Sequence, residues 1–334
     1  MARFLVRRVL QSILVILGVT IITFLALHVI PGDVAHMIGG EKATPEQIEQ
    51  IRQQLGLDQP LYVQYWRFLS SAVRGDFGTS LQTHISAMHE VAIAFPLTFQ
   101  LASLSLLVAA IFGIWLGTIA AVKRGTIVEG LSMAITLVGT SAPVFWIGIL
   151  LLLFGGARLG WFPIGDVISN SIDLRNITHM TIVDSIITGN WQALGNTLHH
   201  LILPVFTLSL LPMAVISRIT RAGMLEVLRQ DYLRTARAKG VRESIVIFRH
   251  ALPNAFLPVV TALGLQFGVL LSGAILTETV FNLPGLGRLV ISSILFRDFP
   301  VIQAIVVVAA VAFTVINLLV DLSYAVFDPR IRYE

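Results

Sequence analysis

The stretch DYLRTARAKGVRESIVIFRHALPNA, residues 231–255, lies between an apolar run at 201–217 and another that begins inside it, at residue 251. Its first part mixes small and apolar residues with charges in a pattern typical of a short helix. Gly240 is placed to end that helix, because glycine takes the left-handed conformation without steric strain. A second helix over about 242–251 would then lead to the Leu-Pro pair at 252–253. The pattern predicts a compact helix–turn–helix element beside the membrane.

Working outward, the chain contains long stretches without Asp, Glu, Lys or Arg. Each is long enough, or nearly so, to cross a bilayer as a helix, for which about 20 residues are needed. Barrel strands alternate over about 10 residues, so these runs do not fit a barrel. We predict an all-α membrane protein with six transmembrane helices. The six runs are Val9–Ile30, Leu97–Val122, Gly130–Ala157, Leu201–Ser217, Ala251–Thr277 and Phe299–Val320.

The first run follows a basic N-terminus, as a signal peptide would. Its 22 residues exceed a typical signal core, and the following HVIPGD lacks a small-residue cleavage site, so we interpret it as a retained span.

The distribution of basic residues predicts the orientation. If both termini are cytoplasmic, 15 of the 23 Lys and Arg residues fall in inside segments, which are less than half as long in total as the outside segments. This is the asymmetry that the positive-inside rule describes. It accounts for the basic isoelectric point without nucleic-acid binding, for which no motif is present. The largest inside segment is 218–250, which contains most of the opening stretch.

The outside segment 31–96 has helical signals of its own. TPEQIEQIRQQLG, residues 44–56, carries a capping box at Thr44 and Gln47, Pro45 at the first helical position, and a terminal glycine. LYVQYWRFLSSAV, residues 61–73, is amphipathic and aromatic-rich, and its rings could lie at headgroup depth. We therefore divide the chain into 1–96, the first span with an outer subdomain, and 97–334, a core with the other five spans and the inside segment 218–250. Scaffold packing and contact with an external partner both remain open for the outer subdomain.

The runs contain no Asp, Glu, Lys or Arg, so the charged proton relays and ion ladders of pumps and secondary carriers are absent from them. Energy for active transport must then enter elsewhere. LPGLG, residues 283–287, lacks the lysine of a phosphate-binding loop. His199 and His200 are adjacent and so point apart, and no nucleophile–base pair is evident. The chain contains no cysteine. We therefore expect no catalytic, cofactor or metal site, and kinks at Pro143, Pro204 and Pro212.

The opening stretch resembles the EAA loop of ABC importer permeases, in which two alanines, a glycine and a later Leu-Pro recur. Thr235 and Ala236 stand at the alanines, Gly240 at the glycine and 251–253 at the end, whereas Arg234 replaces the usual glutamate. DYLRTARAKG is similar to the form found in the dipeptide, oligopeptide and nickel branch. Matches to that branch extend along the chain: HVIPGD, LGLDQPLYVQYW, GDFGTS, MLEVLRQDY, LPNAFLPVVT, ILTETVFNLPGLGRL and NLLVDLSYAVFDPRIR.

The resemblance implies a type I permease fold and a non-ATPase subunit in the cytoplasmic membrane of a bacterium or archaeon. It also implies a second homologous permease, two ABC ATPase subunits that bind ATP and magnesium, and an extracytoplasmic solute-binding protein. The loop around Gly240 would dock on an ATPase. The implied coupling residues are Asp231, Tyr232, Arg234, Thr235, Ala236, Arg237, Lys239, Gly240, Leu252 and Pro253.

The solute is less determined. A peptide is the leading expectation, with glutathione and nickel chelates as narrower alternatives. From the residues, Gln266, Glu278 and Asn317 are candidates to line a solute path, and helix packing explains each equally well. Glu278 belongs to the TETVFNLPGLG segment, which favours a structural role. A self-sufficient channel or secondary carrier, and a membrane scaffold, are the alternatives from other classes. Contact of the basic loop with anionic lipid also remains open.

Overall fold

The computed structural model describes residues 2–29 and 43–327. Within these ranges the chain is helical, apart from turns and one isolated antiparallel bridge between Thr79 and Ser86. Most of HVIPGD and the final residues 328–334 lie outside the described residues. The prediction that the C-terminus is cytoplasmic therefore falls on residues outside the described ranges. The chain divides into two compact units, one made of Met1–Ala94 with Leu289–Ala312 and the other of Phe95–Arg288 with Phe313–Tyr333.

The first unit contains α1 (Ala2–Val29), α3 (Pro45–Leu55) and α4 (Leu61–Ala72). The capping box predicted for α3 is present, and its terminal glycine is left-handed, at φ 66°. On α4 the aromatic residues divide between two roles. Tyr65 packs its ring against Phe24 of α1 and bonds Thr20 at 3.0 Å, whereas Tyr62 and Trp66 are exposed. The amphipathic prediction for α4 is confirmed.

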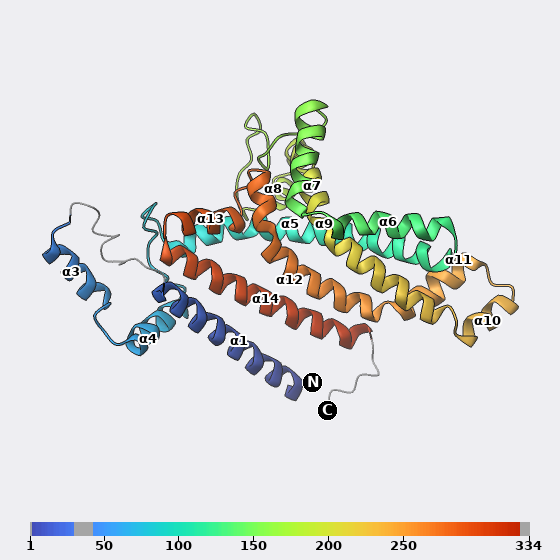
Figure 1. Ribbon diagram of the computed structural model, residues 1–334, viewed down its shortest axis with the longest axis horizontal. Helices are drawn as coiled ribbons and strands as arrows, with labels where there is room; N and C mark the ends of the chain where they lie inside the picture. The colour runs from blue at the N-terminus through green and yellow to red at the C-terminus, as the bar shows by residue number, and fades with distance from the viewer. Residues whose placement is uncertain (1, 30–42, 328–334) are drawn as a thin grey trace. The chain divides into compact units, whose positions relative to one another are not determined.

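The second unit is organised around α9 (Trp191–Val227), which α5 (Ala87–Val122), α6 (Ile127–Ser141) and α12 (Leu257–Val280) flank (Figure 1). Glycines allow the backbones to approach. A Cβ at Gly117 of α5 would overlap the Ser217 carbonyl oxygen of α9. Gly264 and Gly268 of α12 likewise face side chains of α14 (Phe299–Phe327). Each pair of helices therefore uses small residues for close packing, as is common within membranes.

The candidate spans are not all single helices. Among the described residues, four helices, α1, α5, α9 and α14, are long and apolar enough to cross a membrane alone. The other two candidates are bent pairs. Helix α6 meets α7 (Val144–Leu151), continued by the π-helical turns Leu152–Arg158, at 102°, and Glu243–Ala255 meets the start of α12 at 59°. The prediction of six transmembrane helices is thus supported in part: the described residues hold four single candidate spans, or up to six if each bent pair forms one span.

Proline explains one of these breaks. Pro143 lacks a backbone N–H and biases Ala142 toward the extended conformation observed there, at ψ 145°. The predicted interruption at Pro143 is therefore confirmed. Helix α9 continues through Pro204 and Pro212, so neither proline ends it.

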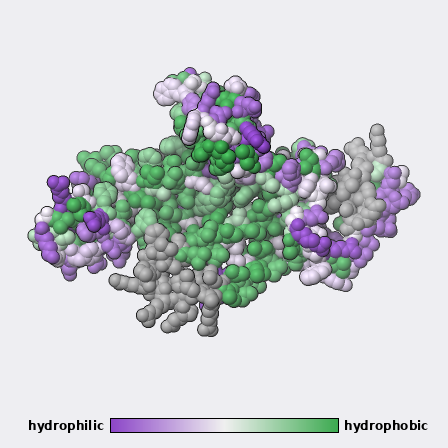
Figure 2. Space-filling view, turned by 180° about the vertical axis from the view of Figure 1, so that it is seen from behind, coloured by the Kyte–Doolittle hydropathy of each residue, from purple (hydrophilic) through white to green (hydrophobic). Residues whose placement is uncertain are grey.

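The remaining helices are shorter: α8 (Thr181–Ile187), α10 (Asp231–Ala238), α11 (Glu243–Ile245) and α13 (Leu286–Leu295). Residues 159–190 form a loop whose only helix is α8. The Asn190 side chain accepts a hydrogen bond from the Ala193 N–H and so begins α9 ten residues before the predicted apolar run. In Figure 2 the surface over the long helices is largely hydrophobic, whereas the end that carries α10, on the left, is hydrophilic.

Candidate functional site

The candidate site is the element of residues 231–255, called the knob below. Helix α10 forms its first half and buries Leu233 completely. Gly240 then has φ 77°, and its N–H bonds the Arg237 carbonyl oxygen at 2.9 Å. A Cβ at Gly240 would meet no atom within 4 Å. Glycine is therefore favoured within this chain by backbone conformation and not by crowding, and the predicted helix–glycine turn is confirmed.

The second half of the knob returns toward the membrane-spanning helices. It comprises α11, a π-helical turn at Val246–Ala251 and a 3₁₀ turn at Leu252–Ala255 that contains the Leu-Pro pair. The predicted second helix is present but irregular.

A single apolar cluster fastens the knob to the longer helices. Leu233 and the buried residues of the second half pack with Met224 of α9 and Ala121 of α5. Close-packed interiors transmit displacement because they contain little free volume. The knob therefore shares one close-packed interior with the ends of α5 and α9. The cluster's buried members are Ala121, Met224, Leu233, Val246, Ile247, Ala251 and Ala255.

Charged side chains cover the outer surface of the knob. Arg237 donates two hydrogen bonds to Glu243, at 3.1 and 2.8 Å, which join the two halves across the glycine turn. These bonds raise the pKa of Arg237 above its ordinary value, so its guanidinium stays charged. Arg234 makes only an exposed 3.4 Å contact with Asp231, and Lys239 is exposed.

The knob is also braced by neutral groups. The Thr235 hydroxyl donates to the Asp231 carbonyl oxygen at 3.1 Å, within α10. The Tyr232 hydroxyl lies 3.5 Å from the His250 carbonyl oxygen, to which the Asn254 amide donates at 2.6 Å. The structure therefore brings the ten predicted coupling residues into one element, with Ala236 packed against the apolar cluster and the charged side chains outward.

Glu278 has a different position from the other candidates. It is fully buried, and one carboxylate oxygen accepts from the Thr98 hydroxyl at 2.6 Å. The other accepts from the N–H groups of Gly287 and Arg288, at 2.7 and 3.2 Å. A carboxylate at a helix N-terminus satisfies free N–H groups and the helix dipole. This geometry favours the structural alternative, in which Glu278 caps α13. Sequence reasoning missed Thr98.

Gln266 and Asn317 lie on neighbouring helices. The contacts of Gly264 with Val320, and of Gly268 with Phe313, place the two polar residues at the same level of α12 and α14. Both are half-buried, and the Gln266 Oε1 atom is buried without a hydrogen-bond partner among the described residues. The pairing of these helices was not visible in the sequence. A neutral polar pair at one level is compatible with either a solute path or helix packing.

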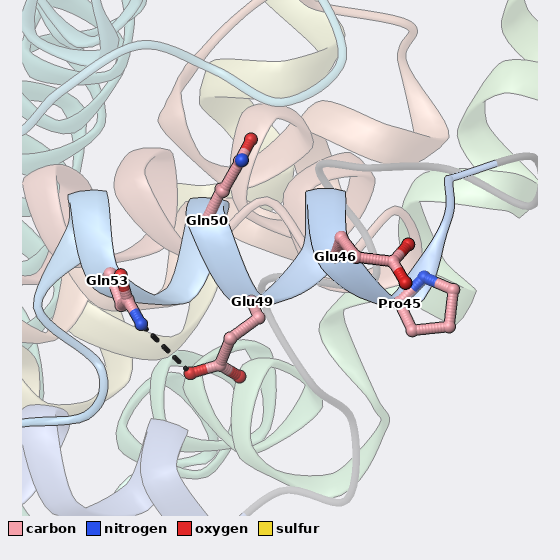
Figure 3. Close-up of a pocket in the computed structure, with 5 residues that line it drawn as sticks. All are labelled: Pro45, Glu46, Glu49, Gln50 and Gln53. Atoms are coloured by element: carbon pink, nitrogen blue, oxygen red, sulfur yellow. Dashed lines mark hydrogen bonds between the residues drawn. The ribbon is translucent and has the colours of Figure 1, made fainter.

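Other parts of the described chain offer weaker candidates for a metal or solute site. No group of three or more His, Asp or Glu side chains among the described residues could hold a metal. His199 bonds the Trp161 carbonyl oxygen and His200 that of Asn196, so the two rings point apart as predicted. A shallow hollow in the first unit is lined only by residues of α3, and Figure 3 shows them on that one helix, with Gln53 hydrogen-bonded to Glu49. With no second element facing it, this hollow lacks the enclosure of a solute site.

Known proteins resemble this chain along its whole length. The family described as "Binding-protein-dependent transport system inner membrane component" matches residues 113–333, and its N-terminal counterpart matches residues 1–102. The dipeptide transport system permease protein DppB of Alkalihalophilus pseudofirmus is 43% identical over 100% of both chains.

Two further relatives carry different solute names. The di/tripeptide transport system permease protein DppB of Pseudomonas aeruginosa is 40% identical, and the glutathione transport system permease protein GsiC of Escherichia coli K12 is 43% identical, each over 100% of both chains. This similarity confirms the family predicted from the opening stretch and the permease assignment. The chain belongs to the inner membrane components of binding-protein-dependent transport systems, as a permease of the dipeptide and oligopeptide type of ABC importer.

Proposed function

We propose that this permease carries peptides inward across the cytoplasmic membrane of a bacterium or archaeon, and that the knob couples it to ATP hydrolysis. The observation that supports coupling most is the knob's construction. Its outer face is charged and exposed, while its inner face shares one apolar cluster with α5 and α9. An ATPase that moves the charged face therefore moves both long helices.

The proposed assembly contains a second homologous permease, two ABC ATPase subunits and an extracytoplasmic solute-binding protein. ATP and magnesium bind to the ATPase subunits, which perform the hydrolysis. Arg234, Arg237 and Lys239 would face acidic groups on the ATPase, since charge complementarity steers docking. The coupling residues predicted from the sequence, from Asp231 to Gly240 with the pair at 252–253, form the proposed docking element.

The proposed orientation places both termini and the knob in the cytoplasm and residues 43–96 outside. It follows the basic residues that flank the apolar helices. The proposed organisation keeps 1–96 as the first span with its outer subdomain and 97–334 as the permease core. Single-cysteine labelling from outside would test the orientation, and the cysteine-free chain provides a clean background. Labelling at position 62 and protection at position 239 are expected.

A di- or tripeptide is the proposed solute because two relatives that match end to end are named for such solutes. Glutathione, itself a tripeptide, is the second candidate, and the glutathione permease relative is the observation that favours it. Gln266 and Asn317 are proposed as neutral hydrogen-bonding groups along the path. Specificity resides mainly in the binding protein.

Reconstitution of the complete complex tests the proposal. We expect uptake of a labelled dipeptide into proteoliposomes that requires ATP, the binding protein and this chain together. Glutathione competition distinguishes the two solute classes. Uptake by this chain alone would instead establish a self-sufficient channel or carrier. An assembled complex whose ATPase activity responds to no peptide would contradict the proposal.

A further inference from the structure

Helix α6 presents a face of small residues to α9. Ser132, Thr136 and Gly139 are buried at spacings of four and three residues, whereas the larger Leu131 is 60% exposed. A Cβ at Gly139 would overlap the Leu210 carbonyl oxygen of α9. Small residues permit close approach. At these three positions α6 therefore projects no large side chain that would resist sliding along α9.

One polar contact fixes the position of α6 along α9. The Arg221 Nε atom of α9 donates to Glu129 Oε1 of α6 at 2.9 Å, and Arg221 Nη2 donates to the same oxygen. The second Glu129 oxygen accepts from the Gly125 N–H at 2.7 Å, in the turn before α6. All three bonds involve charged groups, which makes them stronger than neutral hydrogen bonds.

The pair is also shielded from water. The Arg221 and Glu129 side chains are 30% and 17% exposed, against 74% and 93% for Arg234 and Asp231 on the knob. Exposed pairs contribute little because water screens them. Among the ion pairs described here, the Arg221–Glu129 pair is therefore suited to hold two helices in register.

The location of the pair connects two parts of the second unit. Arg221 lies three residues before Met224, which is completely buried in the apolar cluster beneath the knob. Glu129 lies in the first turn of α6, whose far end leads to the 102° bend at Pro143. The pair thus joins the part of α9 that the knob moves to a helix that ends in a sharp bend.

We propose that Arg221 and Glu129 are positioning residues for transport. Their ion pair transmits movement of the knob from α9 to α6 and remains intact during that movement. Without it, α6 slides along its small-residue face, and ATP hydrolysis no longer displaces α6. The inference rests on the proposed function as an ATP-driven importer.

The test uses the complete reconstituted complex and measures dipeptide molecules imported per ATP hydrolysed. We expect Arg221→Gln and Glu129→Gln each to lower this ratio at least about tenfold, the factor that accompanies loss of a hydrogen bond to a charged group. ATPase subunits should copurify in unchanged amounts. The double variant should lose no more than either single one, because both remove the same contact. Arg52→Gln, which removes an exposed pair in α3, is the matched control and should keep the wild-type ratio.

Three results would overturn the inference. They are an unchanged ratio in the single variants, additive losses in the double variant, or a fall in copurified ATPase that accounts for the whole loss. If the glutamine variants are not recovered, Arg221→Lys tests the same contact and should keep at least about half of the wild-type ratio, since a lysine donates to a carboxylate as a point charge. Failure of the proposed function itself would appear differently, as a wild-type complex without peptide-dependent uptake.

Discussion

Two explanations account for a glycine at position 240: the backbone conformation of the turn, and close approach of an ATPase to it. Substitutions of Gly240 distinguish them. The residue has φ 77°, where a side chain other than glycine, asparagine or aspartate costs about 1–2 kcal/mol. A Cβ there would nevertheless meet no atom of this chain within 4 Å. Gly240→Ala therefore strains the turn while adding little volume. Gly240→Asn is tolerated by the turn but extends a larger side chain into the space outside the knob.

The two variants give opposite rankings under the two explanations. If the turn alone matters, alanine is the more damaging because about 1.4 kcal/mol shifts a local equilibrium tenfold. If an ATPase must approach the turn closely, asparagine is the more damaging. We expect the second ranking: both variants insert in normal amounts, and Gly240→Asn loses more copurified ATPase and more dipeptide uptake than Gly240→Ala.

Membrane yield, ATPase copurification and uptake are measured on the same preparations. Gly75→Asn, at a turn outside the knob with the same φ of 77° and no atom within 4 Å of an added Cβ, is the matched control for an added asparagine. Wild-type copurification and uptake with Gly240→Asn would refute close approach of a partner at this turn. Loss of membrane insertion with Gly240→Asn would show that the substitution disturbs this chain itself.

Three further predictions concern packing and capping. Leu233→Ala removes a fully buried side chain and should destabilise the knob by about 2–5 kcal/mol. Increased proteolysis between α9 and α12 would show this, whereas Lys239→Ala should leave cleavage unchanged. Gly117→Leu forces a side chain into the backbone of α9 and should lower the thermal unfolding temperature of the purified chain, whereas Gly130→Leu, where a Cβ meets nothing within 4 Å, should not. Glu278→Ala leaves the N–H groups at the start of α13 unpaired, which should lower the free energy of unfolding by about 1–3 kcal/mol. The unfolding temperature should fall accordingly, and an unchanged temperature would contradict the cap.

Local features were predictable from the sequence because they depend on residues close together in the chain. The capping box of α3, the break at Pro143 and the turn at Gly240 each follow from backbone conformation that one or two residues impose. Membrane insertion was likewise readable from the length of the apolar runs. The knob was recognisable because its glycine and Leu-Pro pair match the EAA loop of ABC importer permeases.

Features that depend on pairing between distant helices were not predictable. Thr98 and Glu278 are 180 residues apart, and nothing in either local sequence announces that they share a hydrogen bond. Arg221 and Glu129 appeared only as basic and acidic residues near the membrane. The bend between α6 and α7 was foreseen as a kink, but its size depends on where α7 packs and not on Pro143 alone.

The apolar cluster beneath the knob limits how freely permeases can exchange partners by recombination. Because Leu233, Val246 and Ala255 share one packed interior with Ala121 and Met224, the docking loop is not an interchangeable cassette. A graft of residues 231–255 alone would place a foreign inner face on native helix ends. Chimeras designed to recruit another ATPase should therefore include the turns of α5 and α9 that contain Ala121 and Met224, because these turns and the knob form one packed piece of the proposed coupling element.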